Sequence, residues 1–290
     1  ALTINSPNWS NSGTLRAINT NSNLYLQNNW SNTGTIEVTN ATVNLQGSLT
    51  TAGLGSFDRS GGTIKLGTAS VAATLDNTGA TLDLDAIGMG NLSIENGTIN
   101  GGTITASSGS DLIPLSNTNN RLVGATVNAD LNLSQSGGKI KIENGLTLNG
   151  TATVNGLSEI VFTTTASQAL GGSGELVLTW ADGWTPGLWI DGNTTVTIEP
   201  NFTIRGYGNV GQSRYIAGTD TLINQGTIRA GTGNLLTLRP DILNNQGTIE
   251  ATGGGTVSYS GSTSFSNSGI LTVAASSTLN LNGGTVTLAS

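Results

Sequence analysis

Apolar and polar residues alternate along most of the chain in short runs, and glycine, asparagine and serine separate one run from the next. Examples are "ATVNLQG" (41–47), "GLTLNGTATV" (145–154) and "STLNLNGGTVTL" (277–288). Strict alternation is typical of a strand with one buried face, and Asn-x-Gly between such runs is typical of a tight turn. The sequence shows no helical period of useful length. The pattern therefore predicts an all-β protein.

A motif of Asn-x-Gly-Thr followed by apolar-x-apolar recurs along the chain. It reads "NSGTLRA" at 11, "NTGTIEV" at 32, "NQGTIRA" at 224, "NQGTIEA" at 245 and "NSGILTV" at 267. Neighbouring copies are about 21 residues apart, which is too short for a propeller blade of ~40 residues. The spacing fits one coil of a structure in which each coil stacks on the last. We therefore predict a single-stranded parallel β-helix (β-solenoid) with coils of about 21 residues.

Alignment of the motif copies assigns two columns of structural residues. The corner asparagines are expected to stack into an amide ladder, formed by Asn11, Asn32, Asn77, Asn224, Asn245 and Asn267. Two residues before each of them is a large apolar residue in a core slot, formed by Trp9, Trp30, Leu75, Leu222, Leu243 and Phe265. Because leucine and phenylalanine share this slot, we interpret the two tryptophans as core residues and not as a binding surface.

The repeat is regular at both ends of the chain and weak in between. We expect regular coils over residues 1–157 and 193–290, an irregular coil or excursion over 158–192, and one continuous rod. The chain starts in repeat-like sequence, without an initiator methionine or the apolar region of a signal peptide. We therefore interpret it as a mature or excised piece of a longer protein.

Composition excludes several functional classes. Only 9% of the residues are charged, compared with roughly a quarter in an average domain. The absence of cysteine and histidine excludes disulfides, thiolate metal sites and histidine-based catalysis. The net charge is −7 and no basic run occurs, so nucleic acid is not an expected partner. No window approaches ~18 apolar residues, so membrane insertion is not expected either.

The pattern resembles bacterial secreted β-solenoid proteins, namely the filamentous-haemagglutinin-like and autotransporter-passenger-like repeat adhesins. The "N-x-G-T-I" corners and the run "TVTIEPNFTIRGYGNVG" (195–211) carry this resemblance. The resemblance implies export to the cell surface and an adhesive or structural role. The absence of cysteine agrees with passengers that cross an outer membrane unfolded.

Three tryptophans interrupt the rhythm in "GGSGELVLTWADGWTPGLWIDG" (171–192). Trp180 and Trp189 end or interrupt apolar runs, so we expect them to cover the core. Trp184, in "ADGWTPG", is the best candidate for an exposed ring that stacks on a sugar.

Acidic residues suggest two further kinds of site. Asp83 and Asp85 are two apart in "TLDLDA" (81–86), on one predicted strand face, and are candidate calcium ligands. We favour the interpretation that they are solvated, and no other cofactor is expected. A glycosidase or lyase would need converging acids, and successive coils could bring such groups together. The candidates are Asp76, Asp83, Asp85 and Glu95, with Lys139, Lys141 and Glu143 as a second group.

The corner threonines suggest ice binding, but the second position of most copies is charged or amide-bearing and interrupts the double threonine array that this function needs. Strand propensity explains the threonines adequately. The sequence thus favours a non-enzymatic extracellular rod of a bacterial surface adhesin or filament. The expected partners are further copies of the chain, by end-to-end or lateral association, and surface glycans or other cells. The alternative is a carbohydrate-active β-helix or a carbohydrate-binding module.

Overall fold

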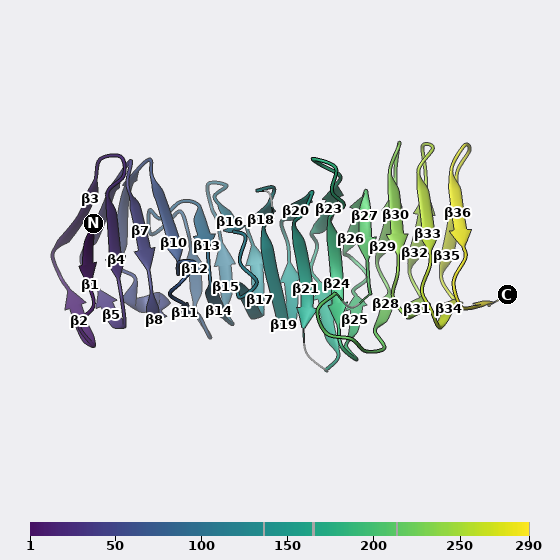
Figure 1. Cartoon of the computed structure of the whole chain (residues 1–290), viewed down its shortest axis with the longest axis horizontal. Coiled ribbons are helices and arrows are strands. Elements are labelled where there is room, and N and C mark those ends of the chain that lie inside the picture. The colour runs from purple at the N-terminus through teal and green to yellow at the C-terminus, as the bar shows by residue number, and fades with distance from the viewer. Residues whose placement is uncertain (136, 164–165, 213, 290) are drawn as a thin grey trace. The chain divides into compact units, whose positions relative to one another are not determined.

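The computed structural model describes residues 1–135, 137–163, 166–212 and 214–289. These residues form parallel stacked strands, with one 3-10 turn, η1 (Thr51–Gly53), and without an α-helix among them. The predicted β-solenoid is therefore confirmed, with about 13 turns of about 22 residues each. Contacts between residues divide the chain into two units, residues 1–132 and 133–290. Figure 1 labels the strands along the chain.

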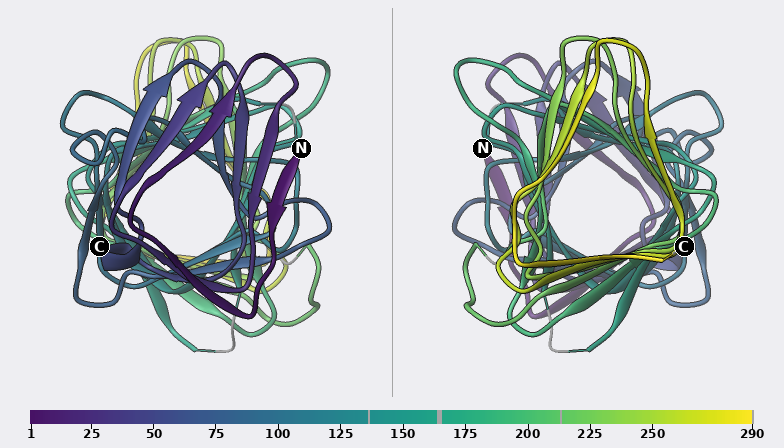
Figure 2. Two further views of the ribbon diagram at one scale, coloured as in Figure 1. Left: turned by 90° about the vertical axis from the view of Figure 1, so that its left-hand side faces the viewer. Right: turned by 90° about the vertical axis from the view of Figure 1, so that its right-hand side faces the viewer.

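A coil in either unit passes through three strands, and each strand pairs with its counterpart in the neighbouring coil. We call the three stacks faces 1, 2 and 3. Figure 2 shows this three-sided path for the first coils of unit 1 in its left view and for the last coils of unit 2 in its right view. Because the stacks are parallel and in register, each residue lies above its equivalent in the previous coil.

Face 1 of unit 1 is a single parallel stack made of β1 (Leu2–Ile4), β4 (Asn23–Leu26), β7 (Thr42–Leu45), β10 (Thr63–Leu66), β13 (Leu92–Ile94), β16 (Asp111–Pro114) and β18 (Asp130–Leu133). Face 2 is made of β2 (Asn8–Asn11), β5 (Asn29–Asn32), β8 (Gly47–Thr50), β11 (Ala73–Asp76), β14 (Gly97–Asn100) and the start of β17 (Arg121–Asn128). Face 3 has two sets, β3 (Thr14–Ile18) with β6 (Thr35–Thr39) and β9 (Ser56–Ser60), and β12 (Thr81–Asp83) with β15 (Thr103–Thr105) and the end of β17.

Unit 2 repeats the arrangement. Its face 1 is made of β20 (Thr151–Asn155), β23 (Glu175–Thr179), β26 (Thr203–Gly206), β29 (Thr227–Ala230), β32 (Thr248–Ala251) and β35 (Ile270–Val273). Face 2 is made of the start of β19 (Lys139–Leu148), β21 (Glu159–Thr163), β24 (Gly187–Asp191), β27 (Gly208–Val210), β30 (Leu235–Leu238), β33 (Thr256–Tyr259) and β36 (Thr278–Leu281). Face 3 is made of the end of β19, β22 (Gln168–Gly171), β25 (Thr195–Ile198), β28 (Thr221–Asn224), β31 (Ile242–Asn245), β34 (Ser264–Asn267) and β37 (Thr285–Leu288).

Alternate residues of each strand point inward and build the core of each unit. In unit 1 the Trp9 and Trp30 rings stack in one inward column, with centroids 5.4 Å apart and planes 12° apart. Leu49 and then Leu75 continue this column. In unit 2 the slot two residues before the motif asparagine lies on face 3 and not on face 2, so the motif copies do not share one face as predicted. The slot holds fully buried side chains there, which are Leu222, Leu243 and Phe265. A tryptophan can occupy a slot that holds leucine in other coils because its polar indole N–H finds a hydrogen-bond acceptor there. Trp30 Nε1 donates to the Gln46 carbonyl over 3.2 Å.

The corner asparagines donate their side-chain amides from coil to coil. Asn11 Nδ2 donates to Asn32 Oδ1 over 2.7 Å. In unit 2, Asn224 Nδ2 donates to Asn245 Oδ1 and Asn245 Nδ2 donates to Asn267 Oδ1, both over 2.6 Å. The asparagines do not form the single column predicted from the motif, because they lie between faces 2 and 3 in unit 1 and between faces 3 and 1 in unit 2. The bonding also varies within unit 1. Asn77 accepts from the Thr51 hydroxyl over 2.7 Å and donates to the carbonyls of Gly101 and Thr103.

Asn245→Ala is expected to lower the free energy of unfolding by about 2 kcal/mol, because it leaves buried amide groups of the ladder without their partner. Asn245 is only 1% exposed and bonds to both neighbouring coils. Gln246→Ala is the matched control, since the adjacent Gln246 accepts a similar 3.0 Å bond from Gln225 at an exposed position. Urea unfolding followed by circular dichroism measures both variants. Equal midpoints for the two would refute a stabilising role of the buried ladder.

The irregularity expected over 158–192 is narrower in the structure. Strands β21 to β24 fall in this segment and pair in register with their neighbours. Among the described residues of this segment, the longest stretch between strands is 180–186, between β23 and β24. None of the described residues belongs to a helix long and apolar enough to cross a membrane.

Candidate functional site

Three successive coils of unit 2 connect face 1 to face 2 through segments of unequal length. Each connection is counted from the last position that pairs in register across all three coils on face 1 to the first position that does so on face 2, leaving out both of these positions. The connections are residues 178–186, 206–208 and 230–236. A segment of three residues thus lies between segments of nine and seven. The longer segments project beyond the short one, and this corner of unit 2 therefore contains a notch.

The short segment depends on Gly206. Its φ is +111°, and a Cβ atom added to it would lie 2.0 Å from the Leu178 carbonyl oxygen. Glycine is the residue that tolerates both the positive φ and the close approach. Directly after it, the Tyr207 N–H donates to the same Leu178 carbonyl over 2.8 Å. Gly206 therefore keeps the connection short and places Tyr207 at the floor of the notch.

The first long segment ends in a small hairpin. Ala181 and Trp184 exchange backbone hydrogen bonds of 3.4 and 2.9 Å. Asp182 and Gly183 between them have φ values of 53° and 79°. Two positive φ values are typical of a type I′ turn, which prefers Asp-Gly. This turn holds the chain out from the coil, and Trp180 lies directly before it, after the end of β23.

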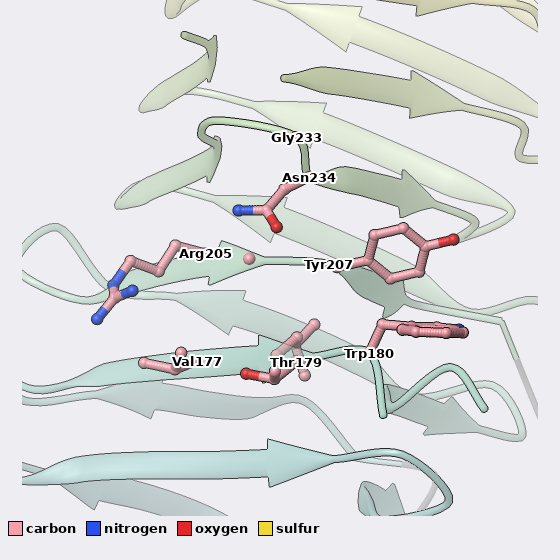
Figure 3. A pocket seen from close by; sticks show the side chains of 9 residues that line it. Val177, Thr179, Trp180, Arg205, Tyr207, Gly233 and Asn234 are labelled. Carbon is pink, nitrogen blue, oxygen red and sulfur yellow. The ribbon is translucent and has the colours of Figure 1, made fainter. Parts of the chain in front are cut away.

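The notch is a cleft of about 400 Å³. Its size lies within the range of about 300–1,000 Å³ that is usual for small-molecule sites. Figure 3 shows that its side chains come from three successive coils. The lining residues are Val177, Leu178, Thr179, Trp180, Arg205, Gly206, Tyr207, Gly233 and Asn234.

Two aromatic rings form one end of the cleft. Trp180 is 53% exposed, and Tyr207, in the next coil, is half-buried. In Figure 3 the Tyr207 ring is seen face-on and the Trp180 ring edge-on, so the two rings are not parallel. Asn234 extends over the cleft from the third coil and Thr179 lies below it. The cleft thus combines ring surface with amide and hydroxyl groups.

Arg205 is fixed at the other side of the cleft by Glu175. Its Nε and Nη2 atoms each donate to a different Glu175 oxygen over 2.7 Å. This hydrogen-bonded ion pair lowers the pKa of Glu175 and raises that of Arg205. Both side chains are about a third exposed, so the pair orients Arg205 more than it stabilises the fold.

Of the three tryptophans of 171–192, Trp184 is exposed as expected, whereas Trp180 is not buried. Trp184 is 55% exposed, as expected of a sugar-stacking candidate, but it is not among the cleft residues. The expectation that Trp180 covers the core is wrong, because β23 ends at Thr179 and Trp180 already belongs to the excursion. Trp189 is buried, yet it lies on the outward side of β24, where the Arg214 guanidinium covers its ring at 5.2 Å.

The candidate calcium ligands are engaged in turns. β12 ends at Asp83, so Asp85 lies in the following turn and not on the same strand face. Asp83 Oδ1 accepts from the N–H groups of Ala86 and Asp85. These bonds, the one from Ala86 first, lower the pKa of Asp83. Asp85 accepts from the backbone N–H of Ser108 and the hydroxyl of Ser110 in the next coil.

The other acids proposed for an enzyme site also have local partners. Glu95 pairs with Lys65 at 3.0 Å, and Asp76 accepts from the Thr78 N–H over 3.1 Å. Lys139 pairs with Glu159 at 3.0 Å. In the part of the chain that the structure describes, no group of three or more acidic side chains is arranged to hold a metal ion.

A cluster around Glu159 was not predicted from the sequence. This carboxylate is 2% exposed and pairs with Lys139 Nζ and Arg214 Nε, each at 3.0 Å. The Tyr215 hydroxyl also donates to it. Arg214 and Tyr215 donate their backbone N–H groups to Asp191 Oδ1 over 2.9 and 3.0 Å. The cluster thus fastens the connection that holds Arg214 and Tyr215 onto face 2 of unit 2.

A second unpredicted group is the carboxyl pair of Asp220 and Asp241 in successive coils. The backbone N–H of each donates to the other's carboxylate, over 3.3 and 3.4 Å. Burial, followed by the charge of Asp241, raises the pKa of Asp220 to about 7. Asp220 is 1% exposed, so its carboxyl group has no open path to a large substrate.

Comparison with protein-family models, with curated proteins and with solved structures gives no match for this chain. The candidate site therefore rests on its own geometry.

Proposed function

We propose that this chain is a non-enzymatic, glycan-binding segment of a bacterial cell-surface adhesin. The observation that carries the proposal is the cleft in which the Trp180 and Tyr207 rings lie beside Thr179 and Asn234. A pyranose has an apolar face that packs on an aromatic ring and hydroxyls at its edge that bond to amides and hydroxyls. Half of the Trp180 surface is open to such a ligand.

The lining of the cleft favours binding over cleavage. Glycoside hydrolysis commonly uses two carboxyl groups on opposite sides of the scissile bond. The described residues that line this cleft include a tryptophan, a tyrosine, an arginine and an asparagine, but not a carboxylate. Glu175, whose carboxylate contacts the cleft residue Arg205, is held by two hydrogen bonds from that arginine.

A repeat fold suits an adhesive role outside the cell. Ladders of backbone hydrogen bonds hold the strands of each unit, and stability is shared between neighbouring coils. Weak sites on a long secreted chain gain strength when many copies act together on one surface. The resemblance of the corner motifs to secreted repeat adhesins supports an extracellular location, and the absence of cysteine agrees with passengers that cross an outer membrane unfolded.

Trp180→Ala is expected to weaken glycan binding by at least about tenfold, because an exposed tryptophan in a cleft is a typical binding hot spot. A glycan array would identify a ligand for the wild-type chain, and titration calorimetry would give both affinities. Because Trp180 is half exposed, its removal should leave the unfolding midpoint nearly unchanged.

Trp184→Ala is the matched control, since this tryptophan is equally exposed and lies outside the cleft. Full binding by Trp184→Ala and weak binding by Trp180→Ala would support the cleft. The reverse result would move the site to the hairpin tip. A parallel assay for new reducing ends tests the non-enzymatic claim, and release of sugar fragments by the wild type would overturn it.

A further inference from the structure

A second hollow lies on the same outward side of face 1 as the cleft. It measures about 260 Å³ and is lined at the beginning of β20, β23 and β26 by polar residues and glycines. These residues are Asn149, Gly150, Thr151, Ser173, Gly174, Glu175, Asn201 and Thr203. The cleft lies at the other end of β23 and β26, where Thr179 and Tyr207 are found. Both hollows therefore open on the same pair of strands.

One ion pair joins the two hollows. Glu175 lines the second hollow and Arg205 lines the cleft, and the two side chains bond to each other over 2.7 Å. In Figure 3 the Arg205 side chain extends toward the beginning of the strands, away from Trp180 and Tyr207. The pair thus lies across the strand surface between the hollows, where its remaining N–H groups can meet a ligand.

The length and charge of this surface indicate which kind of sugar ligand it can bind. β23 runs over five residues, and at about 3.3 Å per residue this gives roughly 16 Å, which is longer than one sugar ring. Arg205 and Glu175 are the charged residues among the described residues that line the two hollows, and each neutralises the other. The surface therefore offers no net charge to an acidic sugar.

We infer that the two hollows are parts of a single groove that binds a neutral polysaccharide along its length, with the chain lying along β23 and β26. Ring stacking on Trp180 and Tyr207 holds one sugar residue. The Glu175–Arg205 pair and the amide of Asn201 hold the residues that follow. This inference rests on the proposed glycan-binding function and adds the length, direction and charge of the ligand.

The test measures affinity against ligand length and charge. The probes are neutral gluco-, manno- and galacto-oligosaccharides from one to six residues, with oligogalacturonates of the same lengths, titrated into the whole chain. We expect a neutral tetrasaccharide to bind at least tenfold more tightly than its monosaccharide, and the matched uronate to bind more weakly. Equal affinity for monosaccharide and tetrasaccharide, or a preference for the uronate, would overturn the groove while leaving the cleft as a sugar site. Absence of binding by every probe would overturn the proposed function as well.

Asn201→Phe tests the second hollow directly. Asn201 is exposed and lines this hollow, so a larger side chain should fill it without disturbing the core. We expect this variant to bind the neutral tetrasaccharide at least tenfold more weakly and the disaccharide as the wild type does. Gln246→Phe, at an exposed position that lines neither hollow, is the control. Unchanged tetrasaccharide affinity in Asn201→Phe would show that the ligand does not reach the second hollow.

Discussion

Gly206→Ala is expected to destabilise unit 2 by about 3–5 kcal/mol and to abolish glycan binding. The alanine Cβ would lie 2.0 Å from the Leu178 carbonyl oxygen, and the φ of +111° is strained for any residue with a Cβ. Positive φ alone costs about 1–3 kcal/mol, and overpacking adds a similar amount. Because the Tyr207 N–H bonds to the same carbonyl, relief of the clash must move the floor of the cleft.

Gly233→Ala is the matched control in the same cleft. Gly233 also has a positive φ, +68°, but an added Cβ would meet no other atom within 4 Å. Its cost should be limited to the strain of about 1 kcal/mol that the left-handed region imposes on alanine. Urea unfolding separates the two variants. Equal losses of stability would show that positive φ, and not the close approach of two coils, makes Gly206 necessary.

The stability of unit 2 is expected to fall by about 3 kcal/mol between pH 4 and pH 7 because of Asp220. The pKa of Asp220 is raised to about 7 in the fold from an ordinary value of 3.8, chiefly by burial. Between these pH values the unfolded chain has lost this proton while the folded chain keeps it. The folded state binds more protons there, so its stability decreases as pH rises through this window and levels off above pH 7.

Asp220→Asn removes this dependence, because an amide does not ionise. We expect the variant to show a flatter profile of unfolding free energy against pH from 4 to 8, whatever its stability at pH 4. Asp241 and Tyr259 face Asp220 from the following coils and are unchanged in this variant. Asp182→Asn, in an exposed turn, should keep the wild-type profile. A profile for Asp220→Asn that runs parallel to the wild type would contradict a buried neutral carboxyl.

The fold follows from the sequence because its signals are local and repeated. The spacing of the Asn-x-Gly-Thr copies gives the coil, and the slot that Trp9 shares with Leu75 gives the inward column. The period is slightly longer than 21 residues on average, because connections such as 178–186 add residues at the corners. Such additions do not disturb the strands, so the motif copies do not reveal them.

The candidate site could not be predicted from any single stretch of the sequence, because it depends on how connections in different coils compare in length. Trp180 looks like the end of an apolar run, and its exposure becomes evident only when residues 178–186 are set beside the shorter connection 206–208. The Glu159 cluster is equally non-local, since Tyr215 is 56 positions further along the chain. In both cases the sequence shows which residue types are present, but only the register of the coils shows which of these residues are in contact.

The unequal corners also bear on how such a protein changes through evolution. In-register strands hold each unit of this solenoid, so a few residues inserted at a corner leave the ladder intact. An insertion beside a short corner creates a wall, and two of them create a hollow, as residues 178–186 and 230–236 do around Tyr207. New recognition surfaces can therefore arise by changes in loop length alone, without a change in any core residue. A lineage of such proteins would diversify its ligands at the corners while its coils stay the same.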